Sequence, residues 1–376
     1  MPLSTTKNKP LNKGNYVHLG LERGLLDQLH SLSETSVPEM RIQLHIDGMK
    51  IFKGCSQGLW PILARFRHPL VGQPFIVGVF SGPGKPDPSD DFLCDCVGEL
   101  KDLLTSGLRI LHTQNSVKMI LDNAICDTPV RCFVRQVKAH NGYYGCDRCS
   151  HMGKSIANRM TFPVCSGRLR DDVSFRLRRQ EPHHKGRSPF EDLPVDMVTS
   201  FPLDYIRLVC LGVVRKLLHI WRLGSSRHSD SLNESIKMYS QNLPAEFSCK
   251  CRTLDCLDFW RTAEYRQFLL YIDPVVLSSA ISEAWYQHFL QFSLAVHIFC
   301  HPILHISCGE YGRLLLNRSV VNFPTLYSPS GIICNVHCLL HLYDDVSRFG
   351  VLANFSAFPF ESFYKVSAAV YKGLLT

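Results

Sequence analysis

Short hydrophobic segments, bounded by glycine and proline, dominate the first third of the chain. Three of them are rich in β-branched or aromatic residues and predict strands over 40–52, 59–66 and 74–81. After a proline-rich turn, apolar residues three and four positions apart predict a helix from about Asp90 to Thr105. A more continuously apolar strand is expected over Val117–Cys126, and Pro129 suits the first turn of a further helix.

Three strands, a helix, a fourth strand and another helix form the element order of the RNase H-like fold, so the sequence predicts an α/β protein with such a core. From about Leu193 the apolar spacing becomes helical. The resulting domain prediction has five parts: an N-terminal arm over 1–38, the first part of the core over 39–140, a basic segment with cysteine and histidine over 141–190, an α-helical region over 191–352, and a C-terminal helix over 353–376. Within the arm, 19–32 has a helical pattern.

The composition is that of a globular protein, with 45% hydrophobic and 20% charged residues among 376. The longest apolar runs contain polar residues and fall short of the ~20 residues that a membrane-spanning helix needs. The N-terminus is polar and basic, unlike a secretory signal, so we expect an intracellular protein without a membrane partner. The sixteen scattered cysteines are then expected to be mostly buried free thiols.

Positive charge is concentrated in two stretches. The net charge is +8, and arginine and lysine are dense over 168–187 and 207–227. These stretches are consistent with a phosphate-rich partner, and equally with a solvated basic surface.

Two aspartates each follow an apolar strand. Asp47 is followed by Gly48, and Asp127 stands two residues before Pro129. Carboxylates at neighbouring strand ends can hold Mg²⁺ or Mn²⁺, which prefer oxygen ligands. The alternative is local: Asp47 closes a turn with Gly48, and Asp127 caps the helix that begins near Pro129.

A Cys-x-x-C motif lies in a glycine-rich turn at Cys146 and Cys149, and thiolates at this spacing can grip one Zn²⁺ ion. Further ligands would come from Cys165, His183, His184 or residues farther along the chain. A redox pair would need a thioredoxin-like βαβ context that the pattern lacks, and two unligated thiols are the remaining alternative. We interpret His337 and His341, four residues apart without an intervening H-E-x-x-H pattern, as packing or polar-network residues.

One more acid stands among aromatic residues near the end of the chain. Glu361 lies in the segment SAFPFESF, at the start of a predicted helix, where an acidic side chain in the first turn needs no further function.

Seven segments in order resemble one known family: HIDGMKIFK with LWPIL, PFIVGVFSGPGKP, AICDTPVRCFV, HNGYYGCDRC, FPLDYIRLVCLGVVRKLL, NVHCLLHLYDDV and SAFPFESF. The succession is similar to the transposases of CACTA (En/Spm) DNA transposons, notably their animal relatives, and it spans about residues 40–365. The resemblance implies a DDE catalytic domain, named for its two aspartates and one glutamate, with an RNase H-like fold that a helical insertion interrupts before the last acid. On this chain it makes the helical region over 191–352 the insertion and the helix over 353–376 the segment that returns to the core.

Carried onto this chain, the resemblance assigns the catalytic, metal-binding acids to Asp47, Asp127 and Glu361, with Glu264 and Asp345 as alternatives for the third. It implies Mg²⁺ or Mn²⁺ as the catalytic cofactor, and two-metal cleavage and strand transfer on DNA. A structural Zn²⁺ ion is expected from the Cys-x-x-C motif itself, with Cys146, Cys149, His183 and His184 as ligands. The implied partners are transposon terminal repeats, target DNA and further copies of the chain, and the implied location is the nucleus.

The chain also departs from this family at one motif. Where the family reads D-Y-M-H, this sequence has Asp204-Tyr-Ile-Arg207, and little chain follows Glu361. A second hypothesis is therefore a domesticated or truncated, catalytically inactive transposon-derived protein that binds nucleic acid or a protein partner.

Overall fold

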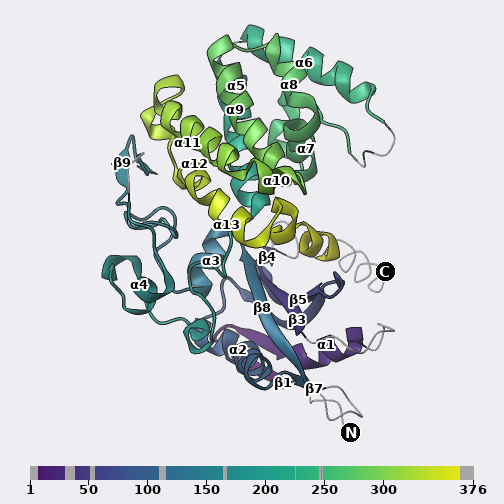
Figure 1. Ribbon diagram of the computed structural model, residues 1–376, viewed down its shortest axis with the longest axis vertical. Coiled ribbons are helices and arrows are strands. Elements are labelled where there is room, and N and C mark those ends of the chain that lie inside the picture. Colours follow the sequence, from purple (N-terminus) through teal and green to yellow (C-terminus); the bar gives the residue numbers. More distant parts are fainter. Residues whose placement is uncertain are drawn as a thin grey trace. The chain divides into compact units, whose positions relative to one another are not determined.

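The computed structural model describes residues 7–29, 39–50, 56–109, 116–163, 167–224, 226–244, 247 and 249–364. The chain is an α/β protein that divides into two compact units (Figure 1). The first, which we call the sheet unit, contains 1–140, 169–202 and 357–376. The second, the helical unit, contains 141–168 and 203–356. Each unit is therefore built from segments that are separated in the sequence.

An eight-stranded mixed sheet forms the centre of the sheet unit. Its strands lie in the order β1-β2-β6-β5-β3-β8-β7, and β4 pairs with β5 beside this path. All neighbours are antiparallel except β3 and β8, which run parallel. The strands are β1 (Lys7–Leu11), β2 (Gly14–His18), β3 (Glu39–Ile46), β4 (Met49–Lys50), β5 (Gln57–His68), β6 (Phe75–Pro83), β7 (Leu108–Arg109) and β8 (Ser116–Cys126).

The expected strands are present, and the sheet also extends into the predicted arm. The segments predicted over 59–66, 74–81 and 117–126 correspond to β5, β6 and β8, and the one over 40–52 becomes β3 and the short β4. The arm predicted over 1–38 contributes β1 and β2, whose polar sequences lack the apolar alternation of a half-buried strand. These strands are recognisable only through their pairing with each other and with β6.

The two faces of the sheet differ because successive side chains of a strand point to opposite sides. On β3, Ile42, Leu44 and Ile46 enter the hydrophobic core. Helices α1 (Leu21–Leu29) and α2 (Ser89–Ser106) contribute apolar side chains to the same core. The alternate residues Gln43 and His45 are also buried, which gives β3 an apolar side and a buried polar side.

Two later segments complete the sheet unit. Helix α3 (Thr128–Val134) follows β8 directly, and the segment 169–202 contains α4 (Asp172–Arg176) and the 3-10 turns η1 (Glu181–His183) and η2 (Pro189–Asp192). This segment bonds to β8, because Ala124 donates its backbone N–H to Ser200 O at 2.8 Å. The last described part of the chain, 358–364, is helical.

The helical unit has a hairpin and a set of packed helices. Its hairpin is β9 (Lys154–Ile156) with β10 (Arg159–Thr161). The helices of its larger segment are η3 (Ile206–Val214), α5 (Arg215–Gly224), α6 (Ser226–Gln241), η4 (Leu254–Phe259), α7 (Thr262–Gln267), η5 (Phe268–Ile272), α8 (Asp273–Ser278), α9 (Glu283–Cys300), α10 (Leu304–Ser307), α11 (Gly309–Leu326), η6 (Pro329–Gly331), α12 (Cys334–Cys338), η7 (Leu339–His341), α13 (Leu342–Phe349) and η8 (Leu352–Phe355). This region is therefore mainly helical, as the sequence predicts. Two of its helices, η3 and η5, are π-helices.

One buried acid makes the stability of the helical unit depend on pH. Asp273 begins α8 and is fully buried, and its burial raises the pKa of the carboxyl to about 8, while the nearby Ser293 side chain opposes the shift. The folded pKa lies above the ordinary value of 3.8, so between these values the folded state holds a proton that the unfolded state has lost. Stability should therefore fall as pH rises through this window.

We expect Asp273→Asn to remove this dependence. Asparagine stays neutral, so the unfolding free energy of the variant should not fall with pH in this way. Relative to the natural chain it should rise by about 1.4 kcal/mol per pH unit between pH 5 and pH 7. Urea unfolding at pH 5, 6 and 7 measures the difference. The exposed Asp344, changed to asparagine, is the matched control in the same unit. A gain that is constant with pH would contradict a neutral, buried Asp273.

Candidate functional site

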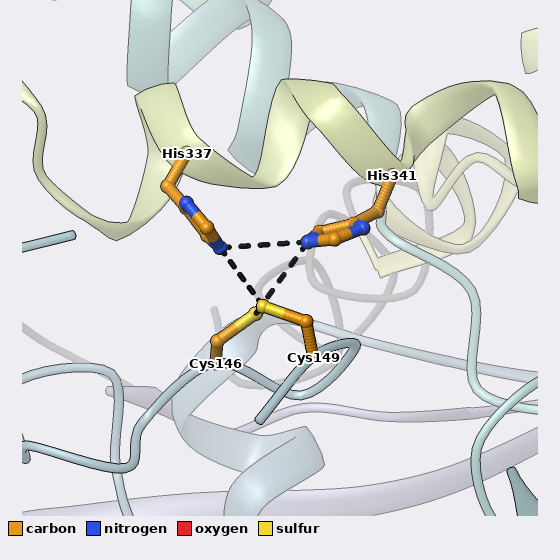
Figure 2. Close-up of side chains that lie close together, drawn as sticks. All are labelled: Cys146, Cys149, His337 and His341. Carbon is orange, nitrogen blue, oxygen red and sulfur yellow. Dashed lines mark hydrogen bonds between the residues drawn. The ribbon is translucent and has the colours of Figure 1, made fainter. Parts of the chain in front are cut away.

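Four side chains from distant parts of the helical unit meet in one buried cluster (Figure 2). Cys146, Cys149, His337 and His341 each turn one ligand atom inward, and these atoms all lie within 4.8 Å of one another. We call this group the Cys2His2 cluster. The described residues contain no other group of three or more Cys, His, Asp or Glu side chains whose ligand atoms lie this close together.

Helix geometry and a glycine-rich turn explain how the cluster forms. His337 in α12 and His341 at the end of η7 are four residues apart, so their side chains lie on the same side of a nearly continuous helical segment. Cys146 and Cys149 approach from the loop that contains the Cys-x-x-C motif. In this loop the backbone N–H of Arg148 donates to Cys146 Sγ at 3.4 Å, which favours the thiolate form of Cys146.

Four of the six separations between the ligand atoms are close to those of a tetrahedral zinc site, and the other two are at most 4.8 Å. Zn–S bonds of about 2.3 Å and Zn–N bonds of about 2.05 Å give tetrahedron edges of about 3.8 Å (S–S), about 3.6 Å (S–N) and about 3.3 Å (N–N). The two sulfurs are 3.5 Å apart and the two Nε2 atoms 3.4 Å apart. Sγ of Cys149 lies 3.3 Å from Nε2 of His337, and Sγ of Cys146 lies 3.7 Å from Nε2 of His341. The residues present therefore fit one Zn²⁺ ion.

The surroundings of Cys146 favour its charged form. Burial works against the thiolate, but hydrogen bonds from Cys149, Cys338, His337 and His341 hold the pKa of Cys146 well below its ordinary value. A thiolate is the form that binds a metal. The lowered pKa of Cys146 and the four ligand atoms of the cluster therefore both favour metal binding.

A buried ion pair joins the same loop to the same helical segment. Arg148, inside the Cys-x-x-C motif, donates through Nη2 to both carboxylate oxygens of Asp345, at 2.9 and 3.0 Å. Asp345 lies four residues after His341, and its Oδ2 also accepts the backbone N–H of Leu203 at 2.8 Å. The two side chains are only 5% and 2% exposed, so solvent screens the pair weakly. The loop is therefore held at two neighbouring points.

The ligand set differs from the predicted one in its histidines. His183 and His184 belong to the sheet unit, where the carbonyl of His183 accepts the N–H of Lys138. Burial and the neighbouring Arg178 lower the pKa of His184 to about 4. Cys165 lies outside the described residues. The interpretation of His337 and His341 as packing residues must be revised, because both are in the cluster.

Parallel pairing brings the two predicted aspartates to one edge of the sheet. The last residues of β3 and β8, Ile46 and Cys126, are direct partners across the parallel pair. Asp47 and Asp127 are the next residues on the two strands. Continued alternation directs both toward the polar side of the sheet, the side of Gln43. We call these residues the aspartate pair.

The local roles considered for both aspartates are also present. Asp47 Oδ1 accepts the backbone N–H of Gly48, and Asp127 Oδ1 accepts that of Val130, each at 2.8 Å. Asp127 is therefore the N-cap of α3. A carboxylate has about four lone-pair sites, so neither of these hydrogen bonds by itself prevents cation binding. The turn and the cap fix the two carboxylates instead of excluding a metal role.

Glu361 belongs to the same unit as the aspartate pair, and its helix is held on the polar side of the sheet. The neighbouring Phe360 is fully buried, stacks on the His45 ring with centroids 4.7 Å apart, and lies 5.1 Å from the Arg65 guanidinium carbon. The charges of Asp47 and Glu361 both act on the hydroxyl of Tyr364. The three acids do not form a group within 4.8 Å of one another among the described residues.

The two alternatives for the third acid are both paired with arginines in the helical unit. Glu264 is 3% exposed and accepts from Arg252 Nη2 at 2.8 Å and from the backbone N–H of Arg261 at 2.7 Å. Asp345 is the partner of Arg148 described above. Both acids therefore have evident structural roles.

Several arginines of the basic stretch over 168–187 interact within the sheet unit. Arg176 forms an ion pair with Asp172 at 2.8 Å and donates to the backbone carbonyls of Glu191, Leu193 and Val195. Arg178 pairs with Glu191 at 2.7 Å, and Arg187 pairs with Asp192. These arginines join α4 and the residues around η1 to η2 and the residues that follow it.

Comparisons with known proteins leave the family open. No family model matches the chain, and no curated protein is similar enough to mark a relative. In the described part of the chain, no helix combines the length and the apolar character that crossing a bilayer requires.

Proposed function

We propose that this chain is the catalytic region of a DDE-type transposase, with Asp47, Asp127 and Glu361 as its acids. One observation carries the proposal: Ile46 pairs with Cys126 across two parallel strands, so the next residue on each strand is an aspartate at the same sheet edge. Carboxylates in this arrangement are the oxygen ligands that Mg²⁺ and Mn²⁺ prefer.

The strand order supports an RNase H-like core within the sheet unit. Strands β3, β5 and β6 follow one another in sequence and pair antiparallel in the order β6-β5-β3. After helix α2, β8 adds parallel to β3. This is the order of three strands, a helix and a fourth strand that the sequence pattern predicts. The departure of the chain into the helical unit before its return at Ala357 agrees with an insertion ahead of the last acid.

The three acids would share the work of holding and orienting two divalent ions. When bound, such ions activate a water molecule and stabilise the leaving oxygen of a phosphodiester. The Gly48 turn and the α3 cap fix the aspartate pair, so its negative charge is concentrated before any ion binds. Phe360, between His45 and Arg65, orients the helix that bears Glu361. DNA would be the substrate, and lysines and arginines would contact its phosphates in a salt-dependent manner.

A structural Zn²⁺ ion in the Cys2His2 cluster is the second part of the proposal. Its four ligands are all protein side chains and all buried, as in closed structural zinc sites. The ion would join the Cys-x-x-C loop to the α12–α13 segment, where the Arg148–Asp345 pair also acts.

The alternative is a transposon-derived protein that binds nucleic acid or protein without catalysis. Arg207 favours it, since the resembling family has histidine at this place. In the structure Asp204 is buried and its Oδ2 accepts the backbone N–H of Arg207 at 3.1 Å. The backbone role of Asp204 thus persists without the histidine.

A nicking assay separates the two functions. The zinc-loaded protein is incubated with supercoiled plasmid in Mg²⁺ or Mn²⁺, and DNA binding is measured in parallel. A transposase should produce nicked circles whose 3′-hydroxyl ends a polymerase can extend, and EDTA should abolish them. Binding without nicks in either ion would favour the inactive alternative, and absence of both would contradict both functions.

A further inference from the structure

One buried hydroxyl near the aspartate pair lacks a hydrogen-bond partner among the described residues. It belongs to Tyr364, whose ring is partly exposed while its hydroxyl oxygen is buried. Tyr364 lies three residues after Glu361 in the last helical segment, so the two side chains lie on the same side of that helix.

A ring contact and an electrostatic effect place this hydroxyl near the proposed acids. The Tyr364 ring lies 6.0 Å from the ring of His45, which precedes Asp47 by two residues on the same side of β3. Burial raises the pKa of the Tyr364 hydroxyl well above its ordinary value, and the charges of Asp47, Cys126 and Glu361 add to the effect. The hydroxyl is therefore within electrostatic reach of an acid from β3 and of one from its own helix.

A buried hydroxyl without an acceptor is costly, because it has given up its hydrogen bonds to water. Near anionic groups the Tyr364 hydroxyl stays protonated. It can lower the cost of its burial only by donating a hydrogen bond to an oxygen. Groups of this kind are common around metal sites, where they orient ligands and bound water.

We propose that Tyr364 is a further residue of the carboxylate site and donates a hydrogen bond to an oxygen that arrives with the divalent ion. This inference rests on the proposed function. The acceptor is an anionic or metal-polarised oxygen, supplied by ion-bound water or by a DNA phosphate. The hydroxyl keeps its proton throughout, so no group transfer is involved.

The test is Mn²⁺ binding by the zinc-loaded chain with Tyr364→Phe, which removes only the hydroxyl oxygen. Calorimetric titration should show about 10-fold weaker Mn²⁺ binding, the lower end of the effect of losing an outer ligand contact. Without Mn²⁺ the thermal midpoint should be unchanged or higher, because the variant no longer buries an unpaired hydroxyl. Tyr271→Phe, at a tyrosine that is 53% exposed in the helical unit, is the matched control and should change neither quantity.

Comparison with Asp47→Asn distinguishes failure of this inference from failure of the proposed function. If Asp47→Asn abolishes Mn²⁺ binding while Tyr364→Phe changes neither Mn²⁺ affinity nor DNA affinity measured in Ca²⁺, the site is real and the role of Tyr364 is overturned. If Tyr364→Phe weakens Mn²⁺ binding in the absence of DNA, the acceptor is ion-bound water. If it weakens only DNA binding, the acceptor is a DNA phosphate. If Asp47→Asn leaves Mn²⁺ binding intact, the proposed function and this inference both fail.

Discussion

Replacement of Cys149 by serine is expected to release zinc and to destabilise the helical unit by several kcal/mol. A structural zinc site contributes on the order of 10 kcal/mol in small domains, and this unit also has a hydrophobic core that limits the loss. The serine hydroxyl is a poor zinc ligand, and it leaves Cys146, His337 and His341 as an incomplete buried set. Zinc content is measured by mass spectrometry, and stability by the thermal midpoint. We expect one zinc per natural chain, almost none in the variant, and a lower thermal midpoint for the variant.

Two controls make this result specific to the Cys2His2 cluster. Cys94→Ser changes an exposed cysteine in the sheet unit and should leave both quantities unchanged. His183→Ala tests the predicted ligand set, and it should retain zinc because His183 belongs to the other unit. Full zinc content in Cys149→Ser, or its loss in His183→Ala, would contradict the assigned ligands.

Asp47→Asn is expected to reduce nicking on the order of 10³-fold, equivalent to about 4 kcal/mol of transition-state stabilisation. The amide has almost the same shape, and its oxygen can still accept the N–H of Gly48, so the turn should persist. What is lost is the negative charge that holds a divalent ion. The initial rate of plasmid nicking at saturating Mg²⁺ measures the effect, and DNA affinity should be almost unchanged.

Asp127→Asn should have the same effect, since its amide oxygen can still accept the N–H of Val130 as the cap of α3. Asp91→Asn is the matched control, because Asp91 is an exposed acid in the first turn of α2 in the same unit. Glu361→Gln should resemble the aspartate variants if Glu361 is the third acid. Nicking that survives in both aspartate variants would show that these residues do not carry the activity.

The aspartate pair could be located from the sequence because its signals are local. The strand that precedes Asp47 and the turn that follows it lie within one short window of sequence, and so do the apolar strand before Asp127 and the start of the helix after it. The register of β3 against β8, which places the two strand ends side by side, could not be predicted from these local patterns. That register depends on long-range pairing and on the packing of the apolar face.

The zinc ligands were only half predictable for a related reason. Cys146 and Cys149 form a short motif, but His337 lies 188 residues after Cys149, and His341 lies 195 residues after Cys146. The histidines carry a weak signal, their spacing of four on a helix, and only folding shows which thiols they meet. The nearer His183 and His184 were favoured by sequence distance, which gives little information about spatial distance.

The long separation within the Cys2His2 cluster also affects how the chain matures during synthesis. Cys146 and Cys149 leave the ribosome long before His337 and His341, so for most of translation the Cys-x-x-C loop can hold zinc only with substitute ligands. Closing such a long loop costs entropy, which metal binding and the Arg148–Asp345 pair offset together. Phe360 and Glu361 emerge shortly after His341. The two histidines of the Cys2His2 cluster and the last proposed acid therefore leave the ribosome at nearly the same stage of synthesis, long after the two cysteines.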